Sequence, residues 1–250
     1  MPECIHGLEI PLCDACYPKT PPEKPVPVRA TRATGARTAR VAGVRTSRKS
    51  IDPAQQRVYH VTHISNLESI LDLDALSVSV PPTLDVSTAL TRELRQTAEV
   101  SADRPVAGFV PFYLAPSATH WDDLRRGAED ETRWSAAARA AASVDFVVLV
   151  TTVASLGTDA VVTDGDAAAS FTRFTTGNEI TAALTKLHDS ETLDAAEVLA
   201  WESVPFEAIQ LIGVANDRVR DRVRELTSTK VAVYPPWFQA EVQASPSLEG

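Results

Sequence analysis

Residues 19–50 most limit what this chain can fold into, because they divide the sequence into parts of different character. The segment is rich in Pro, Thr, Ala and Arg and contains almost no large apolar side chains. Such a composition cannot bury enough surface to offset the entropy lost on ordering the chain. We therefore expect a flexible linker, preceded by a small Cys/His module at 1–18 and followed by a folded domain at 51–240. Residues 241–250 are expected to form a disordered tail.

Charge is distributed as unevenly as hydrophobicity. Residues 17–50 contain nine Lys or Arg and one acidic residue. Residues 51–250 contain fifteen basic against twenty-nine acidic residues, which gives a formal net charge of −14. A basic arm binds nucleic acid through its phosphates, whereas an acidic body is a poor general phosphate binder. We expect the linker to tether nucleic acid. The alternative is a linker whose charge only offsets the acidic body.

The sequence lacks signals for secretion or membrane insertion. The first residues contain no basic segment followed by an apolar stretch, which a secretory signal requires. The longest apolar run, residues 146–150, is far too short to cross a bilayer. We therefore expect a cytoplasmic protein without membrane association.

All three cysteines lie in the first sixteen residues, close to one histidine. Cys4, His6, Cys13 and Cys16 supply four thiolate or imidazole groups, the number that closes a tetrahedral Zn²⁺ site. A segment this short has no core of its own, so metal binding would supply its folding energy. We expect one zinc ion here. The alternative is an unstructured terminus with reactive thiols.

Short apolar runs alternate with amphipathic ones in residues 51–240, which predicts an α+β domain. Strands are expected at residues 58–62, 106–114, 146–153, 197–201, 208–214 and 231–234. Helices are expected after a capping-box pattern at 65–68, and at 121–142, 178–188 and 217–226. Residues 163–174 are expected to form a short helix or turn.

Polar side chains gather at two places where chemistry is plausible. His60 and Thr62 share one face of an expected strand, and Asn66 lies where the next helix opens, a junction that can hold an amide or phosphate ligand. Glu197 begins an apolar run, where a carboxylate either faces a cleft or is an ordinary solvated residue at a strand edge. The pattern leaves both readings open. No P-loop, GxGxxG, HExxH or GxSxG motif is present, which removes the common signatures of NTPases, dinucleotide dehydrogenases, zinc proteases and serine hydrolases.

Five segments of the body carry a family resemblance. They are HVTHISNLESI (60–70), RELR (92–95), VPFYLA (110–115), DGDAAASFTRF (164–174), and AAEVL (195–199) followed by VPFE (204–207). In this order they resemble motifs of the DarT family, the DNA ADP-ribosyltransferase toxins of toxin–antitoxin systems, and together they cover about residues 57 to 240. The resemblance implies an α+β ADP-ribosyltransferase-like fold.

The resemblance also implies an activity and a set of site residues. It implies an NAD⁺-dependent pentosyltransferase that takes NAD⁺ as a substrate, releases nicotinamide and modifies a base in single-stranded DNA. His60, Thr62 and Asn66 match the motif that holds the nicotinamide end of NAD⁺. Arg95 matches the catalytic arginine and Glu197 the catalytic glutamate. An antitoxin protein is the implied partner.

One departure from the family keeps alternatives open. The Arg-Ser-Pro-Met-like turn that follows the family's central strand is replaced here by PSATH (116–120), which has no arginine. Together with the acidic body, this favours keeping RNA, a protein or a small molecule as alternative acceptors. A non-catalytic module that binds NAD⁺ or nucleic acid is the third reading, and the presence of both Arg95 and Glu197 argues against it.

Overall fold

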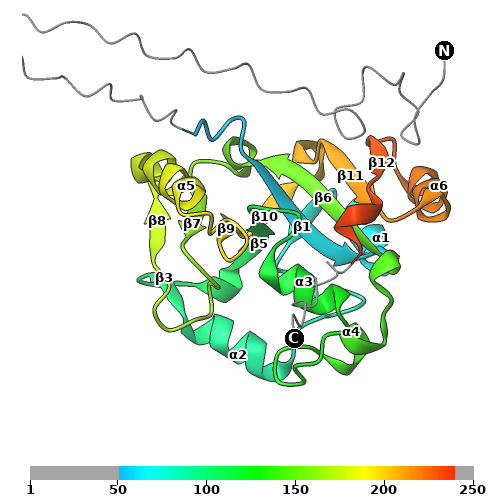
Figure 1. Ribbon diagram of the computed structural model, residues 1–250, viewed down its shortest axis with the longest axis horizontal. Coiled ribbons are helices and arrows are strands. Elements are labelled where there is room, and N and C mark those ends of the chain that lie inside the picture. Colours follow the sequence, from blue (N-terminus) through cyan, green and yellow to red (C-terminus); the bar gives the residue numbers. More distant parts are fainter. Residues whose placement is uncertain (1–50, 240–250) are drawn as a thin grey trace, which may run out of the picture. The chain divides into compact units, whose positions relative to one another are not determined.

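An eight-stranded sheet forms the centre of residues 51–239, the part of the chain that this computed structural model describes (Figure 1). Its strand order is β12-β11-β6-β1-β5-β9-β7-β8, and β11–β12 is its parallel pair among antiparallel neighbours. The strands are β1 (Arg57–His63), β5 (Phe109–Tyr113), β6 (Phe146–Thr152), β7 (Val161–Thr163), β8 (Phe174–Thr176), β9 (Glu197–Trp201), β11 (Leu211–Val214) and β12 (Val231–Val233). Two further pairs join β2 (Ala75–Ser77) to β10 (Ser203–Pro205) and β3 (Glu99–Ser101) to β4 (Arg104–Pro105).

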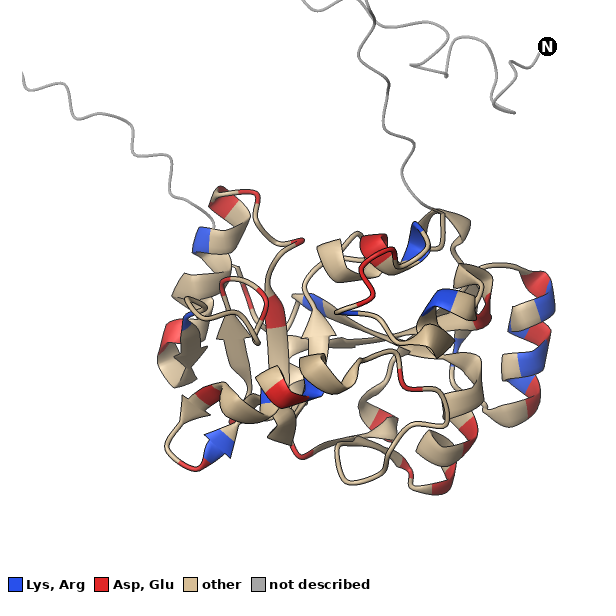
Figure 2. Cartoon of the chain, turned by 90° about the horizontal axis from the view of Figure 1, so that it is seen from below, with Lys and Arg blue, Asp and Glu red and all other residues tan. Residues whose placement is uncertain are grey.

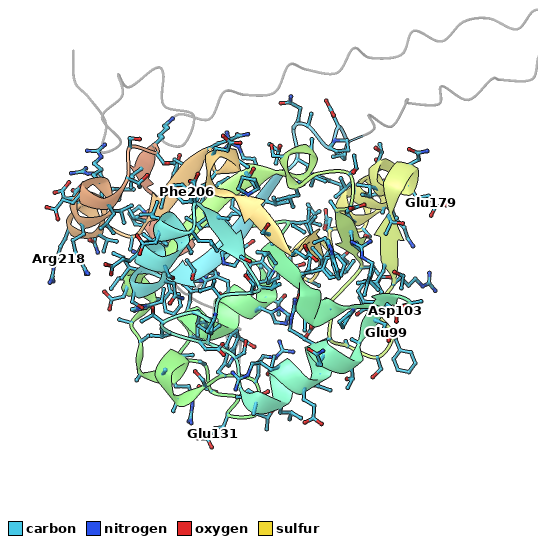
Figure 3. The ribbon with its side chains drawn as sticks, turned by 180° about the vertical axis from the view of Figure 1, so that it is seen from behind. Glu99, Asp103, Glu131, Glu179, Phe206 and Arg218 are labelled. Atoms are coloured by element: carbon cyan, nitrogen blue, oxygen red, sulfur yellow. The ribbon has the colours of Figure 1, made fainter. Side chains whose placement is uncertain are left out.

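Short helices connect the strands. They are α1 (Leu67–Asp72), α2 (Ala89–Thr97), α3 (Thr119–Arg125), α4 (Ala136–Ala140), α5 (Ile180–Asp189) and α6 (Asp217–Leu226). Figure 3 places Arg218 of α6 and Glu179, which precedes α5, on opposite sides of the described domain. Within residues 51–239, no helix has the length and hydropathy needed to cross a membrane.

Strand β6 explains why both faces of the sheet are covered. All but its last residue are buried, and successive side chains of a strand point to opposite faces. Val147 and Leu149 accordingly pack in the cluster that contains α5 and α6, whereas Val148 and Val150 pack with Trp121 of α3. The two faces of β6 therefore pack in separate apolar clusters, and a third cluster surrounds Phe109, Val161 and Leu199 of β5, β7 and β9.

The end of the described chain is fixed to α3. The indole Nε1 of Trp121 donates a hydrogen bond to the carbonyl oxygen of Trp237 at 2.5 Å. Arg125 Nη1 donates to the same carbonyl and to that of Gln239, at 3.2 and 3.0 Å. The Trp237 ring stacks on Tyr234 with 4.3 Å between centroids. The hydrogen bonds from Trp121 and Arg125 therefore attach α3 to a segment more than 100 residues later in the sequence.

The structure confirms the α+β class and the helix at 217–226, where the Asn216 side chain accepts from the Val219 N–H as an N-cap. The single helix expected at 121–142 is wrong, because the chain leaves α3 through left-handed residues at Gly127 and Ala128 and re-enters a helix only at α4. Of the helix or turn expected at 163–174, the structure forms turns, in a loop that connects β7 to β8. The predicted zinc module, basic linker and tail lie outside the described residues.

Candidate active site

The sheet is nearly divided between β1 and β5. These neighbours share one residue pair, Tyr59 with Tyr113, whereas β1 and β6 share seven pairs. Pro111 of β5 has no backbone N–H with which to continue the ladder. Its carbonyl oxygen instead accepts a hydrogen bond of 2.8 Å from Nδ1 of His60. A side chain thus bridges the two strands where the backbone pairing ends.

A cavity of about 930 Å³ opens along this division. It lies within the usual size range of small-molecule sites. Its walls come from β1, α1, the 75–87 segment, α2, β5 and the loops at 130–134 and 166–170. His60, Thr62, Asn66, Arg95 and Glu197 all line it, so the five residues predicted for the catalytic and nicotinamide sites are brought together.

Glu197 is the first residue of β9, and its side chain is only 3% exposed. Its backbone N–H donates to the Thr163 hydroxyl of β7 at 2.9 Å, which fixes where the strand starts. Arg95 of α2 places Nη1 3.6 Å from Glu197 Oε2, and that oxygen is buried without a hydrogen-bond partner. Of the two readings that the sequence left open, the cleft-facing carboxylate is the one observed.

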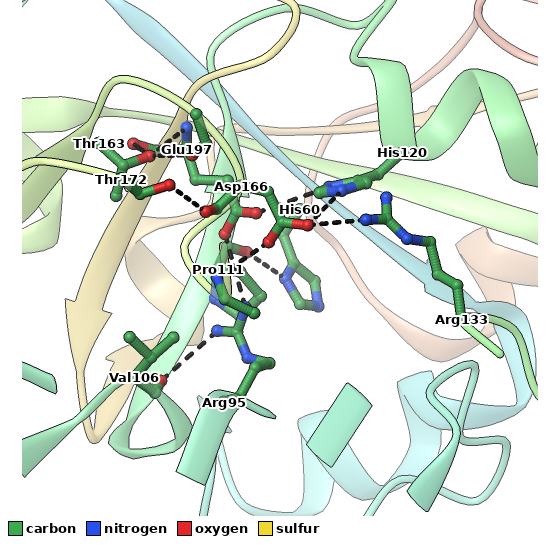
Figure 4. Close-up of polar contacts among 12 residues, drawn as sticks. His60, Arg95, Val106, Pro111, His120, Arg133, Thr163, Asp166, Thr172 and Glu197 are labelled. Atoms are coloured by element: carbon green, nitrogen blue, oxygen red, sulfur yellow. Dashed lines mark hydrogen bonds and ion pairs between the residues drawn. The ribbon is translucent and has the colours of Figure 1, made fainter. Parts of the chain in front are cut away.

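A second carboxylate, Asp166, lies beside Glu197 with two basic partners (Figure 4). Arg133 Nη2 donates to Asp166 Oδ2 at 2.8 Å, and His120 Nε2 lies 3.1 Å from the same oxygen. Burial alone would raise the pKa of Asp166. The hydrogen bond and charge of His120, the Ala168 N–H and the charge of Arg133 outweigh burial and hold that pKa well below its usual range. Asp166 is therefore a carboxylate at neutral pH.

The His60 imidazole is neutral and has a defined tautomer. Burial lowers its pKa, against the opposing effect of its hydrogen bond to Pro111. Because a carbonyl oxygen can only accept, Nδ1 carries the hydrogen and Nε2 keeps a free lone pair. His60 can therefore accept a hydrogen bond from a ligand in the cavity.

The Asn66 side chain is already engaged with the protein. Its Oδ1 accepts from the Leu84 N–H at 2.8 Å, and its Nδ2 donates to the Leu84 carbonyl at 3.0 Å and to the Thr62 hydroxyl at 2.9 Å. Asn66 and Thr62 are both buried. In this structure the two side chains hold one wall of the cavity in place, and their predicted contact with NAD⁺ stays a prediction.

The sequence did not single out His120, Asp166, Arg133 or Thr163. Asp166 lies in a segment that the family resemblance marked as lining the site, so a signal was available for it. His120 appeared only as part of a departure from the family pattern. Arg133 fell in the wrongly expected helix, and Thr163 carries no local signal.

His120, Asp166 and Glu197 offer ligand atoms that lie within 4.8 Å of one another, as a metal site would. Arg95 and Arg133 contact the same two carboxylates. The chain's own cations therefore compensate the negative charge here, and we interpret the group as an ion-pair network. The predicted zinc ligands Cys4, His6, Cys13 and Cys16 lie outside residues 51–239.

Comparison with protein families finds one match over most of the chain. The family model described as "DarT: ssDNA thymidine ADP-ribosyltransferase, DarT" matches residues 59–239. No curated protein matches the sequence. The family match covers the same segment as the five motifs and includes every described site residue.

Solved structures show the same fold. The Thermus sp. 2.9 DarT in complex with ADP-ribosylated ssDNA has a TM-score of 0.63 and 22% identity, and the match covers 76% of this chain and 99% of that one. The same Thermus protein in complex with NAD⁺ gives a TM-score of 0.59 at 22% identity, with 76% and 100% coverage. Thermosipho africanus DarTG in complex with ADP-ribose gives 0.57 at 19% identity, with 73% and 51% coverage. The predicted ADP-ribosyltransferase-like fold is confirmed.

The bonds of Asn66 generate a stability prediction. Asn66→Ala removes both hydrogen bonds to Leu84 and leaves buried polar groups unpaired, so the free energy of unfolding should fall by about 1–3 kcal/mol. Hydrogen exchange at the Leu84 amide should accelerate relative to wild type. Ser79→Ala, at an exposed serine of the same segment, is the matched control. Unchanged exchange at Leu84 in Asn66→Ala would contradict the anchoring role.

Proposed function

The chain belongs to the DarT family of ssDNA thymidine ADP-ribosyltransferases, and we propose that it transfers ADP-ribose from NAD⁺ to thymidine in single-stranded DNA. The observation that carries this proposal is the buried Glu197 carboxylate, which faces a cavity of about 930 Å³ beside Arg95 and whose Oε2 has no hydrogen-bond partner within residues 51–239. NAD⁺ is a substrate in this reaction. Its nicotinamide is released, and its ADP-ribose becomes covalently attached to the base. The Thermus relatives in complex with NAD⁺ and with ADP-ribosylated ssDNA support the same substrates.

Glu197 suits the chemistry at the ribose. Breaking the bond between nicotinamide and ribose sends the bonding electrons to nicotinamide and leaves an oxocarbenium-like carbon. A neighbouring carboxylate stabilises that positive charge, and more strongly where water is excluded. A thymidine base has one ring N–H, since its other ring nitrogen carries the sugar. As that nitrogen bonds to the ribose carbon, its proton passes to Glu197.

Arg95 and His60 suit the binding of NAD⁺. The Arg95 guanidinium lies 3.6 Å from Glu197 Oε2, so it orients the carboxylate and leaves other N–H groups for a phosphate. The free Nε2 of His60 accepts a hydrogen bond from a ribose hydroxyl or an amide. Thr62 and Asn66 support that wall, and contact between their polar groups and nicotinamide is part of the proposal.

The net negative charge of residues 51–250 opposes the approach of single-stranded DNA, which is also negatively charged. Figure 2 shows acidic and basic residues interspersed over the described domain. We assign nucleic-acid attraction to residues 19–50, whose basic side chains contact phosphates without fixed geometry, while base choice stays in the cavity. Thermosipho africanus DarTG, of which the match covers 51%, supports an antitoxin as the protein partner and a toxin role.

The catalytic role of Glu197 is tested by Glu197→Gln. The substitution keeps size and removes the charge, so transfer of labelled ADP-ribose from NAD⁺ to a thymidine-containing oligonucleotide should fall by about 10²–10⁴-fold. Thermal unfolding should stay near that of wild type. Glu202→Gln, at an exposed glutamate in the turn after β9, should keep full activity. Equal transfer by wild type and Glu197→Gln would remove Glu197 from the mechanism, and transfer to RNA or protein alone would overturn the DNA assignment.

We propose that Cys4, His6, Cys13 and Cys16 bind one Zn²⁺, on the strength of their number and spacing. Metal analysis of the reduced, purified protein should find one zinc per chain. The paired variant Cys13→Ser/Cys16→Ser should lose it because half of the ligands are gone. Reduced wild-type protein without zinc would contradict the proposal.

The tether proposal predicts a change in salt dependence. Replacing the nine Lys and Arg of residues 19–50 with Gln should weaken binding of single-stranded oligonucleotides and flatten its dependence on salt. Each lost phosphate contact removes a log–log slope of roughly 0.7 for single strands. Base preference should not change. Unaltered affinity and slope would identify the segment as a linker whose charge has no part in binding.

A further inference from the structure

His120 lies between two carboxylates that come from different elements. It sits on α3, and its Nε2 is 3.1 Å from Asp166 Oδ2 while its Nδ1 is 3.5 Å from Glu197 Oε1. The side chain is 16% exposed and lines the cavity. His120 is the last residue of the PSATH segment (116–120), which follows β5.

Asp166 determines which way the imidazole can act. Its low pKa makes it a carboxylate, which only accepts hydrogen bonds. Arg133 and the Ala168 N–H hold it in place, and its backbone carbonyl accepts from the Thr172 hydroxyl at 2.5 Å. In its neutral form, the step of the cycle at which it can act as a base, His120 donates from Nε2 to Asp166. Its Nδ1 lone pair then faces Glu197.

Glu197 needs a group that can take its proton away. After accepting the proton of the thymidine ring it is a neutral carboxylic acid, and its side chain is only 3% exposed to solvent. Arg95 on its other oxygen is a permanent cation and cannot accept a proton. His120 contacts Oε1, and separations of this size shorten when substrate fills a site.

We propose that His120, oriented by Asp166, receives the thymidine proton from Glu197 and passes it to solvent. The O–H bond of protonated Glu197 breaks, an N–H bond forms at Nδ1, and an imidazolium results between the two carboxylates. Loss of one proton to water restores the neutral ring for the next turnover. His120 acts through Glu197, so it is a positioning residue for proton removal. The inference rests on the proposed function and adds to it.

Charged and titratable groups face His120 from each packed element. They are Glu197 from β9, Asp166 and its partner Arg133 from the two loops, Arg95 from α2, and Tyr113 from β5, whose ring centroid lies 6.0 Å from that of His120. Burial, and next the charge of Glu197, raises the pKa of Tyr113 far above its usual value. Tyr113 thus stays protonated and offers no second site for the proton.

The test compares two nucleobases whose ring N–H groups differ in acidity. His120→Gln keeps a hydrogen-bond donor for Asp166 but cannot accept a proton, so transfer to a thymidine oligonucleotide should fall by about 100-fold. A second oligonucleotide carries 5-bromouracil in place of thymine, and its electron-withdrawing bromine makes the same ring N–H more acidic. The loss of transfer by His120→Gln relative to wild type should therefore be smaller with this oligonucleotide. The acid limb of the pH–rate profile should also change in His120→Gln. His188→Gln, at an exposed histidine of α5, is the matched control.

Each outcome decides the matter. An equal deficit for both bases, or full activity of His120→Gln, overturns the proton role and leaves the proposed function standing. If wild type transfers ADP-ribose to neither oligonucleotide, the proposed function fails and this inference fails with it. Should His120→Gln not fold, Asp166→Asn replaces it. That variant should lose less transfer activity than expected for His120→Gln, and its loss relative to wild type should again be smaller with the 5-bromouracil oligonucleotide. Equal deficits in that variant overturn the proposal.

Discussion

The hydrogen bond between His60 and Pro111 marks the constraint on which the rest of this structure depends. Two neighbouring strands of one sheet separate after a single residue pair, and a proline at the point of separation prevents the backbone from closing the gap. The cavity exists because of that separation. The strand ends, helices and loops around it then supply polar side chains to a space inside a sheet that would otherwise be apolar on both faces.

Charge compensation makes such a space compatible with folding. An isolated buried carboxylate would cost several kcal/mol, so Glu197 and Asp166 each need a partner. Arg95 of α2 and Arg133 of the 130–134 loop provide these, and His120 connects the two pairs (Figure 4). Glu197 Oε2 faces the Arg95 guanidinium but has no hydrogen-bond partner among the described residues, which leaves that oxygen able to accept a hydrogen bond from a bound substrate.

Sequence patterns and the family resemblance predicted the fold class and the residues that meet in the cavity. Glu197 was visible as a carboxylate at the head of an apolar run. The burial of Glu197 could not be seen in the sequence. The start of its strand is positioned by a hydrogen bond to the hydroxyl of Thr163, which lies 34 residues earlier in the chain. His120 and Asp166 are 46 residues apart, and no local pattern joins them. The long helix expected after residue 121 failed because its Ala- and Arg-rich composition hides the left-handed turn at Gly127 and Ala128.

The attachment of Trp237 to Trp121 has a consequence for the order in which a ribosome makes this domain. Helix α3, which carries His120, is synthesised 116 residues before the carbonyl that anchors it. A nascent chain therefore holds Glu197 and its arginines before α3 has its final support. Completion of the site coincides with completion of the domain, so an unfinished chain lacks a fully supported His120.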